Sequence, residues 1–180
     1  MEDKQIHAEG KFSTARIYTD GQHIYYALAG KDSTDDLYRM NLDGSGVINL
    51  EINTDPSWFL TEKYIYYFPH DKMNILNPNG QVALISMCNT IWRCDHDGGN
   101  KTKVVEFERS EKGFIQIHDV QVIGNYAYTD YYEYVDKNDS GFFESDQDRL
   151  YYSTNDPTNP HILRIDLTTG EVIKLNIPDV

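Results

Sequence analysis

The sequence predicts an all-β protein built from repeated four-stranded antiparallel sheets. Three observations predict this fold class. Apolar residues alternate with period two along nearly the whole chain. No window longer than about ten residues keeps the apolar stripe of an amphipathic helix. One group of strand and turn signals also recurs three times. With 180 residues, the chain is long enough for one sizeable domain and short for two.

The first copy of this unit is a meander of four short strands separated by turns rich in Gly and Asp. Asp20 and Gly21 form a dipeptide typical of β-hairpins, and they join the first two strands. The strands expected in this copy cover residues 15–20, 23–27, 37–42 and 47–51.

The same unit recurs twice with longer spacings. Its strands are expected at residues 57–62, 64–68, 90–95 and 103–107, and then at 118–123, 126–129, 161–166 and 171–175. Two markers align the copies: the second-strand tyrosines Tyr25, Tyr66 and Tyr128, and the third-strand arginines Arg39, Arg93 and Arg164. The tyrosines are 41 and 62 residues apart and the arginines 54 and 71, so insertions have stretched a period of about 40.

The insertions cover residues 69–89 and 131–160, and the three sheets cover about 12–51, 57–108 and 115–176. Both insertions fall between the second and third strands of their copy, so they should project from one face of a single domain, residues 1–180. In repeat proteins the face that carries insertions is often the binding face, although loops also lengthen without function.

A period of about 40 with four strands per repeat is typical of β-propeller blades. Residues 21–26 and 37–45 resemble the YWTD-type blade of low-density-lipoprotein-receptor-related proteins. They resemble more closely a bacterial β-propeller family of unknown function. The motif's Trp is replaced by Tyr26 and Tyr67, and Thr168-Thr169-Gly170 replaces Asp-Gly-Ser in the third copy. The resemblance implies an extracellular or cell-envelope binding module without established catalysis.

Three blades do not close a ring, because propellers typically have four to eight. Two chains could complete a six-bladed ring as a homodimer, or the chain could be part of a larger propeller. A third alternative is that the insertions and residues 5–12 build a degenerate fourth blade or a cap. We expect an incomplete ring that associates.

Charge and hydropathy exclude several classes of function. The formal net charge of −13 opposes binding to nucleic acid or to anionic lipid. The longest apolar run, residues 82–88, is too short to span a bilayer. The first residues lack the basic and apolar regions of a secretory signal, so none is predicted and the compartment stays open.

The second insertion contains a candidate calcium loop. Asp136, Asn138 and Ser140, followed by Gly141, match the oxygen ligands of the first half of an EF-hand-type loop, and Glu144 lies nearby. The twelfth position is Gln rather than Glu, and no helix is expected on either side. The alternative is a solvated acidic loop with no cofactor.

The sequence gives weaker signals for two other functions, a transition-metal site and enzymatic catalysis. Cys88, Cys94 and His96 could form part of a transition-metal site, but they lack a fourth ligand, and Cys94 is expected to pack as a small apolar residue. No serine lies in a nucleophile-elbow motif. Paired carboxylates such as Asp130 and Glu133 are expected by chance among 29 acids. We therefore expect no enzyme.

The aromatic residues divide into two groups. Trp58 and Trp92 are expected to fill the packing between sheets. Tyr131, Tyr132 and Tyr134 lead into the acidic insertion and are the candidate anchors for a protein or polysaccharide partner. The function expected is therefore a non-catalytic binding module. The alternatives are a carbohydrate-active enzyme (glycosidase or lyase) on the same scaffold and a purely structural segment of a larger envelope protein.

Overall fold

The structure is a computed structural model that describes residues 12–29, 35–54, 58–69, 71–76, 81–107, 109–110, 113–135, 149–150 and 162–175. The chain divides into two compact units. The first contains Met1–Pro69 and Trp92–Thr102, and the second contains His70–Ile91 and Lys103–Val180.

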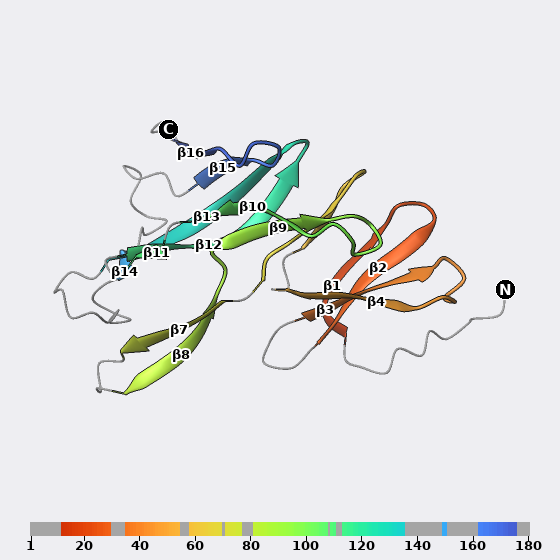
Figure 1. The fold of residues 1–180 in the computed structure, drawn as a ribbon, viewed down its shortest axis with the longest axis horizontal. Helices are drawn as coiled ribbons and strands as arrows, with labels where there is room; N and C mark the ends of the chain where they lie inside the picture. The colour runs from red at the N-terminus through yellow and green to blue at the C-terminus, as the bar shows by residue number, and fades with distance from the viewer. Residues whose placement is uncertain are drawn as a thin grey trace. The chain divides into compact units, whose positions relative to one another are not determined.

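The first sheet is a simple meander with the order β1-β2-β3-β4 and antiparallel pairing throughout (Figure 1). Its strands are β1 (Phe12–Thr19), β2 (His23–Ala29), β3 (Asp35–Asn41) and β4 (Ile48–Thr54). Four consecutive residues of β2, from Tyr25 to Leu28, are buried. Since successive side chains of a strand point to opposite sides, β2 is covered on both faces.

The second sheet repeats this plan, with one insertion. It has the order β10-β9-β6-β5, and its strands are β5 (Phe59–Leu60), β6 (Ile65–Tyr67), β9 (Thr90–Cys94) and β10 (Thr102–Glu106). Between the second and third of these strands, β7 (Asp71–Leu76) and β8 (Val82–Met87) pair as a separate antiparallel hairpin. The first insertion therefore adds a hairpin of its own to the second copy.

The third sheet contains the same four-strand meander, β12-β13-β15-β16, extended by two short strands. The four strands are β12 (Gly113–Ile123), β13 (Tyr126–Val135), β15 (Ile162–Asp166) and β16 (Val172–Leu175). Strand β11 (Arg109–Ser110) pairs with β12, and β14 (Arg149–Leu150) pairs with β13.

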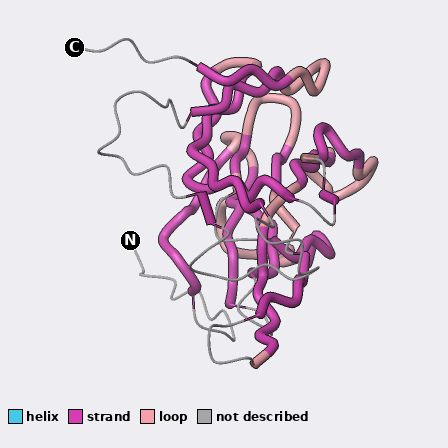
Figure 2. The backbone as a smooth tube through the Cα atoms, turned by 90° about the vertical axis from the view of Figure 1, so that its left-hand side faces the viewer, coloured by secondary structure: helices cyan, strands magenta, loops and turns pink. Residues whose placement is uncertain are grey.

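The predicted all-β class and the repeated four-stranded antiparallel sheets are therefore confirmed. Figure 2 shows strands joined by loops and turns. In the part of the chain that the structure describes, no helix is long and apolar enough to cross a membrane.

The core of the first unit lies between the first sheet and strands of the second. Tyr25 and Leu37 of the first sheet pack in one cluster with Trp58, Ile65 and Cys94. Trp58 is 1% exposed, and Trp92 packs against the same cluster. The expectation that the two tryptophans fill inter-sheet packing is confirmed.

The second unit has its own buried sheet face. Ala127 and Thr129 alternate along β13, face Ile165 and Leu163 of β15, and are all buried. Ile117 of β12 is buried as well. The residues between them in β13 and β15 are partly exposed, so one face of this sheet is covered much more fully than the other.

The turn between the third and fourth strands has one geometry in the first two sheets. Asn41 N–H donates to the Ser45 carbonyl, and Gly44 N–H donates to the Asn41 carbonyl. Asp95, Gly98 and Gly99 make the same two bonds in the second sheet.

These turns approach a preceding strand closely within each unit. A Cβ at Gly98 would lie 2.7 Å from the Leu50 carbonyl oxygen in β4, and one at Gly170 would lie 2.6 Å from the Val104 carbonyl oxygen in β10. The same contact therefore occurs once in each unit, between a turn and the fourth strand of the preceding copy.

Candidate functional site

The predicted anchor residues lie in a strand rather than in a loop. Strand β13 continues to Val135, because β12 supplies partners for it as far back as Gly113. Tyr131 is only 3% exposed, and the Lys174 ammonium lies 5.4 Å from the centre of its ring. Tyr131 therefore belongs to the packed face of the sheet. Tyr132 and Tyr134 occupy the neighbouring β13 positions that pair with Gln116 and Phe114.

The candidate calcium ligands lie outside the described residues. This holds for Asp136, Asn138, Ser140 and Glu144. Calcium binding by this loop therefore stays a prediction. Among the residues that are described, no group of three His, Cys, Asp or Glu side chains is placed to hold a metal ion.

The end of the first insertion is tied by backbone hydrogen bonds to other parts of the second unit. Ile117 N–H donates to the Cys88 carbonyl at 3.0 Å, and Phe107 N–H donates to the Asn89 carbonyl at 2.8 Å. Cys88 directly follows the β7–β8 hairpin, and Ile117 is the β12 partner of Tyr131. The residue that ends the first insertion is therefore bonded beside the strand position where the second insertion was expected to begin.

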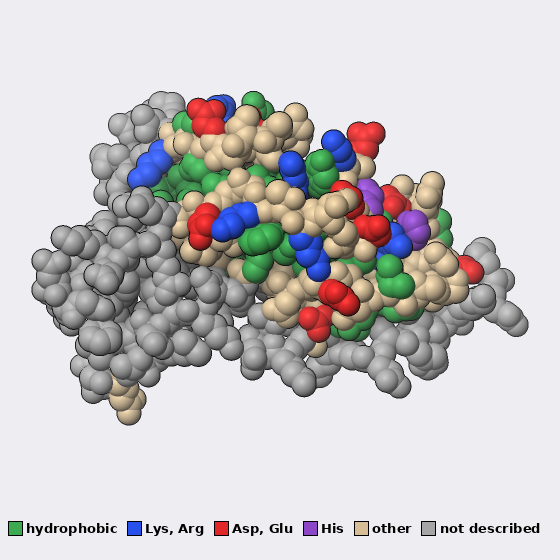
Figure 3. Space-filling model, in the orientation of Figure 1, with side chains coloured by type: hydrophobic (Ala, Val, Ile, Leu, Met, Phe, Trp, Pro, Cys, Tyr) green, Lys and Arg blue, Asp and Glu red, His purple; other side chains and the backbone are tan. Residues whose placement is uncertain are grey.

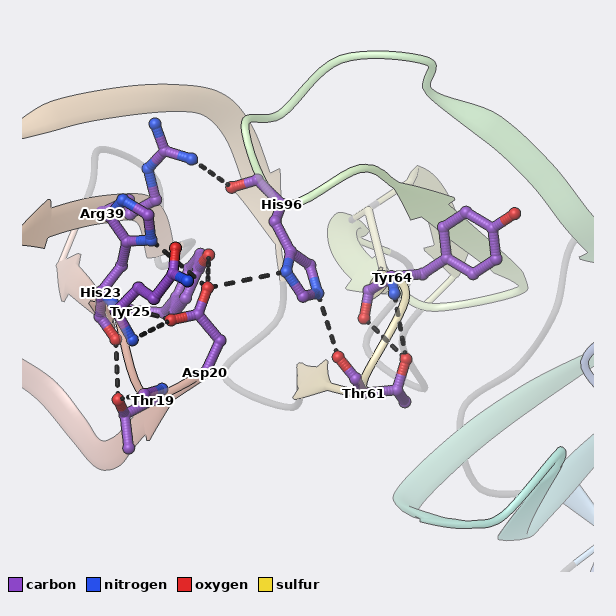
Figure 4. A network of polar contacts seen from close by, with 10 residues as sticks. Thr19, Asp20, His23, Tyr25, Arg39, Thr61, Tyr64 and His96 are labelled. Atoms are coloured by element: carbon purple, nitrogen blue, oxygen red, sulfur yellow. Dashed lines mark hydrogen bonds and ion pairs between the residues drawn. The ribbon is translucent and has the colours of Figure 1, made fainter.

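A second cluster of polar side chains surrounds Asp20 in the first unit (Figure 4). Its Oδ1 accepts hydrogen bonds from the backbone N–H groups of Gln22 (2.8 Å) and His23 (2.7 Å), which closes the hairpin turn. Its Oδ2 accepts a hydrogen bond from the Tyr25 hydroxyl at 2.8 Å and lies 3.3 Å from His23 Nδ1. Figure 3 shows histidine side chains next to acidic ones at the surface.

The electrostatics of this cluster favour an ionised Asp20. Partial burial alone would raise the pKa of Asp20, but the hydrogen bonds from Gln22, His23 and Tyr25 outweigh it and hold the pKa well below its ordinary value. Burial and the hydrogen bond to the Asp20 carboxylate together raise the pKa of Tyr25 to about 12. At neutral pH the tyrosine is therefore a hydrogen-bond donor to a carboxylate.

His96 contacts both the Asp20 cluster of the first sheet and a backbone carbonyl of the second sheet. Its Nδ1 lies 3.7 Å from Asp20 Oδ2, and its Nε2 lies 3.0 Å from the Thr61 carbonyl oxygen. Arg39 donates to the His96 carbonyl at 3.2 Å. Each ring nitrogen of His96 thus faces an oxygen atom, a carboxylate oxygen at Nδ1 and a carbonyl oxygen at Nε2. Contacts of this kind hold the first sheet against the second.

In the sequence His96 lies close to Cys88 and Cys94, with which it could form part of a transition-metal site. In the structure Cys94 is a free thiol in the apolar core of the first unit, so the expectation that it packs as a small apolar residue is confirmed. Burial raises the pKa of the Cys94 thiol to about 12. A signal for the true partner of His96 was present: Asp20 heads a hairpin turn, and an Asp there has a carboxylate oxygen free to meet another element.

Comparison with known proteins adds no assignment. No known family matches the chain, and no curated protein matches it either.

Proposed function

We propose that this protein is a non-catalytic binding module whose three sheets are β-propeller-type blades. The support for blades is the repetition itself. Each sheet has the same four-strand order, and each long insertion enters between the second and third strands. The contact between a turn glycine and a preceding fourth strand also occurs in both units, at Gly98 and at Gly170.

The binding surface proposed lies in the second unit, at the β13 positions that lead into the second insertion, beside the end of the first insertion. The observation that carries it is the hydrogen bond between Ile117 N–H and the Cys88 carbonyl, which ties the base of one insertion to the strand beside the other. Insertions carried on a rigid sheet are a common way to present a recognition surface. Tyr132 and Tyr134 remain the proposed anchors. Tyr131 is buried in the same strand and is no longer proposed to contact the partner.

The partner class is a protein or a polysaccharide, because aromatic side chains serve as anchors for both kinds of surface. The experiment is a binding screen with the full chain on a panel of glycans and in pull-downs. A variant in which residues 136–148 are replaced by a short Gly-Asn turn keeps β13 and β14 and removes the acidic segment between them.

The result expected is binding by the intact chain that the shortened variant and a Tyr132→Ser/Tyr134→Ser double variant lose. Tyr64→Ser is the matched control, since it removes a half-exposed tyrosine outside both insertions. Binding that survives both changes would contradict the assignment, as would the absence of any binding by the intact chain. Turnover of a glycan on the same panel would instead identify the carbohydrate-active enzyme.

A further inference from the structure

We draw no further inference here: the strongest candidate, the partly exposed face of the third sheet that carries Tyr126, Tyr128 and Arg164, supports no proposal, because nothing among the described residues shows what covers it.

Discussion

Tyr128 and Arg164 are direct cross-strand partners in the third sheet. The same pairing of tyrosine with arginine occurs in the first sheet, between Tyr25 and Arg39, and in the second, between Tyr66 and Arg93. The arginine also lies over a preceding aromatic ring in two sheets, 4.6 Å from the centre of Tyr64 in one and 5.1 Å from that of Tyr126 in the other. These pairs are structural markers of the repeat.

The tyrosine hydroxyl has a different energetic role in different copies. Tyr25 donates to the Asp20 carboxylate at 2.8 Å, whereas no hydrogen bond of the Tyr128 hydroxyl occurs among the described residues. Tyr25→Phe should therefore lower the free energy of unfolding by about 1.5 to 3 kcal/mol, the value of a hydrogen bond to a charged group. Tyr128→Phe should change it by less than about 0.5 kcal/mol. Urea denaturation of both variants measures the difference, and equal effects would contradict it.

The low pKa of Asp20 predicts how stability responds to acid. Since the folded-state pKa lies below the unfolded value of about 4, ionised Asp20 stabilises the folded state above that pH. This contribution is lost as the pH falls below about 4. Asp20→Asn should therefore lower stability at pH 7 and flatten its decline between about pH 5 and pH 2.

Urea denaturation at a series of pH values measures this response. Glu62→Gln removes one exposed charge without touching the network and is the control. If Asp20→Asn and Glu62→Gln gave parallel curves, the hydrogen bonds to Asp20 would not be the source of the effect.

The strands and their repetition could be predicted because alternation and turn residues are local signals. The start of β12 at Gly113 rather than at His118 could have been found, since Phe114, Ile115 and Ile117 already show part of the alternation. Residues 131–135 are harder to predict as strand, because adjacent tyrosines break a simple apolar–polar pattern. Strand β13 continues through them because β12 supplies a pairing partner for each, which is a contact that local alternation does not show.

The candidate site was harder to predict because its contacts join positions far apart in the sequence. Nothing local to His96 indicates Asp20, and the nearest His or Cys residues suggested a metal cluster instead. Only the register between sheets brings the two residues together. The exposure of Ile17 and Leu42 was also unpredictable, because alternation shows that they lie in or beside strands without showing what covers them.

Cys94 should be chemically inert while the first unit is folded. The thiol is buried in the core and its pKa is raised to about 12, so only about one molecule in 10,000 carries a thiolate at pH 8. Cys88→Ala leaves Cys94 as the single thiol. In this variant we expect no reaction with a disulfide reagent in native buffer and complete reaction in urea. Prompt labelling of the native variant, with its circular dichroism unchanged, would contradict the prediction.

Three glycines with positive φ separate backbone strain from crowding. Gly21, Gly98 and Gly170 all have φ near +80°, where a residue with a Cβ is strained by about 1 to 2 kcal/mol. A Cβ at Gly21 would meet nothing within 4 Å, so Gly21→Ala should cost only that strain.

At Gly98 and Gly170 the new Cβ would press on the carbonyl oxygens of Leu50 and Val104. Overpacking against backbone adds about 1 to 3 kcal/mol, so Gly98→Ala and Gly170→Ala should each destabilise the chain more than Gly21→Ala in urea denaturation. Three equal losses would mean that these turns do not press on the preceding strands, which would remove one support for the blade arrangement.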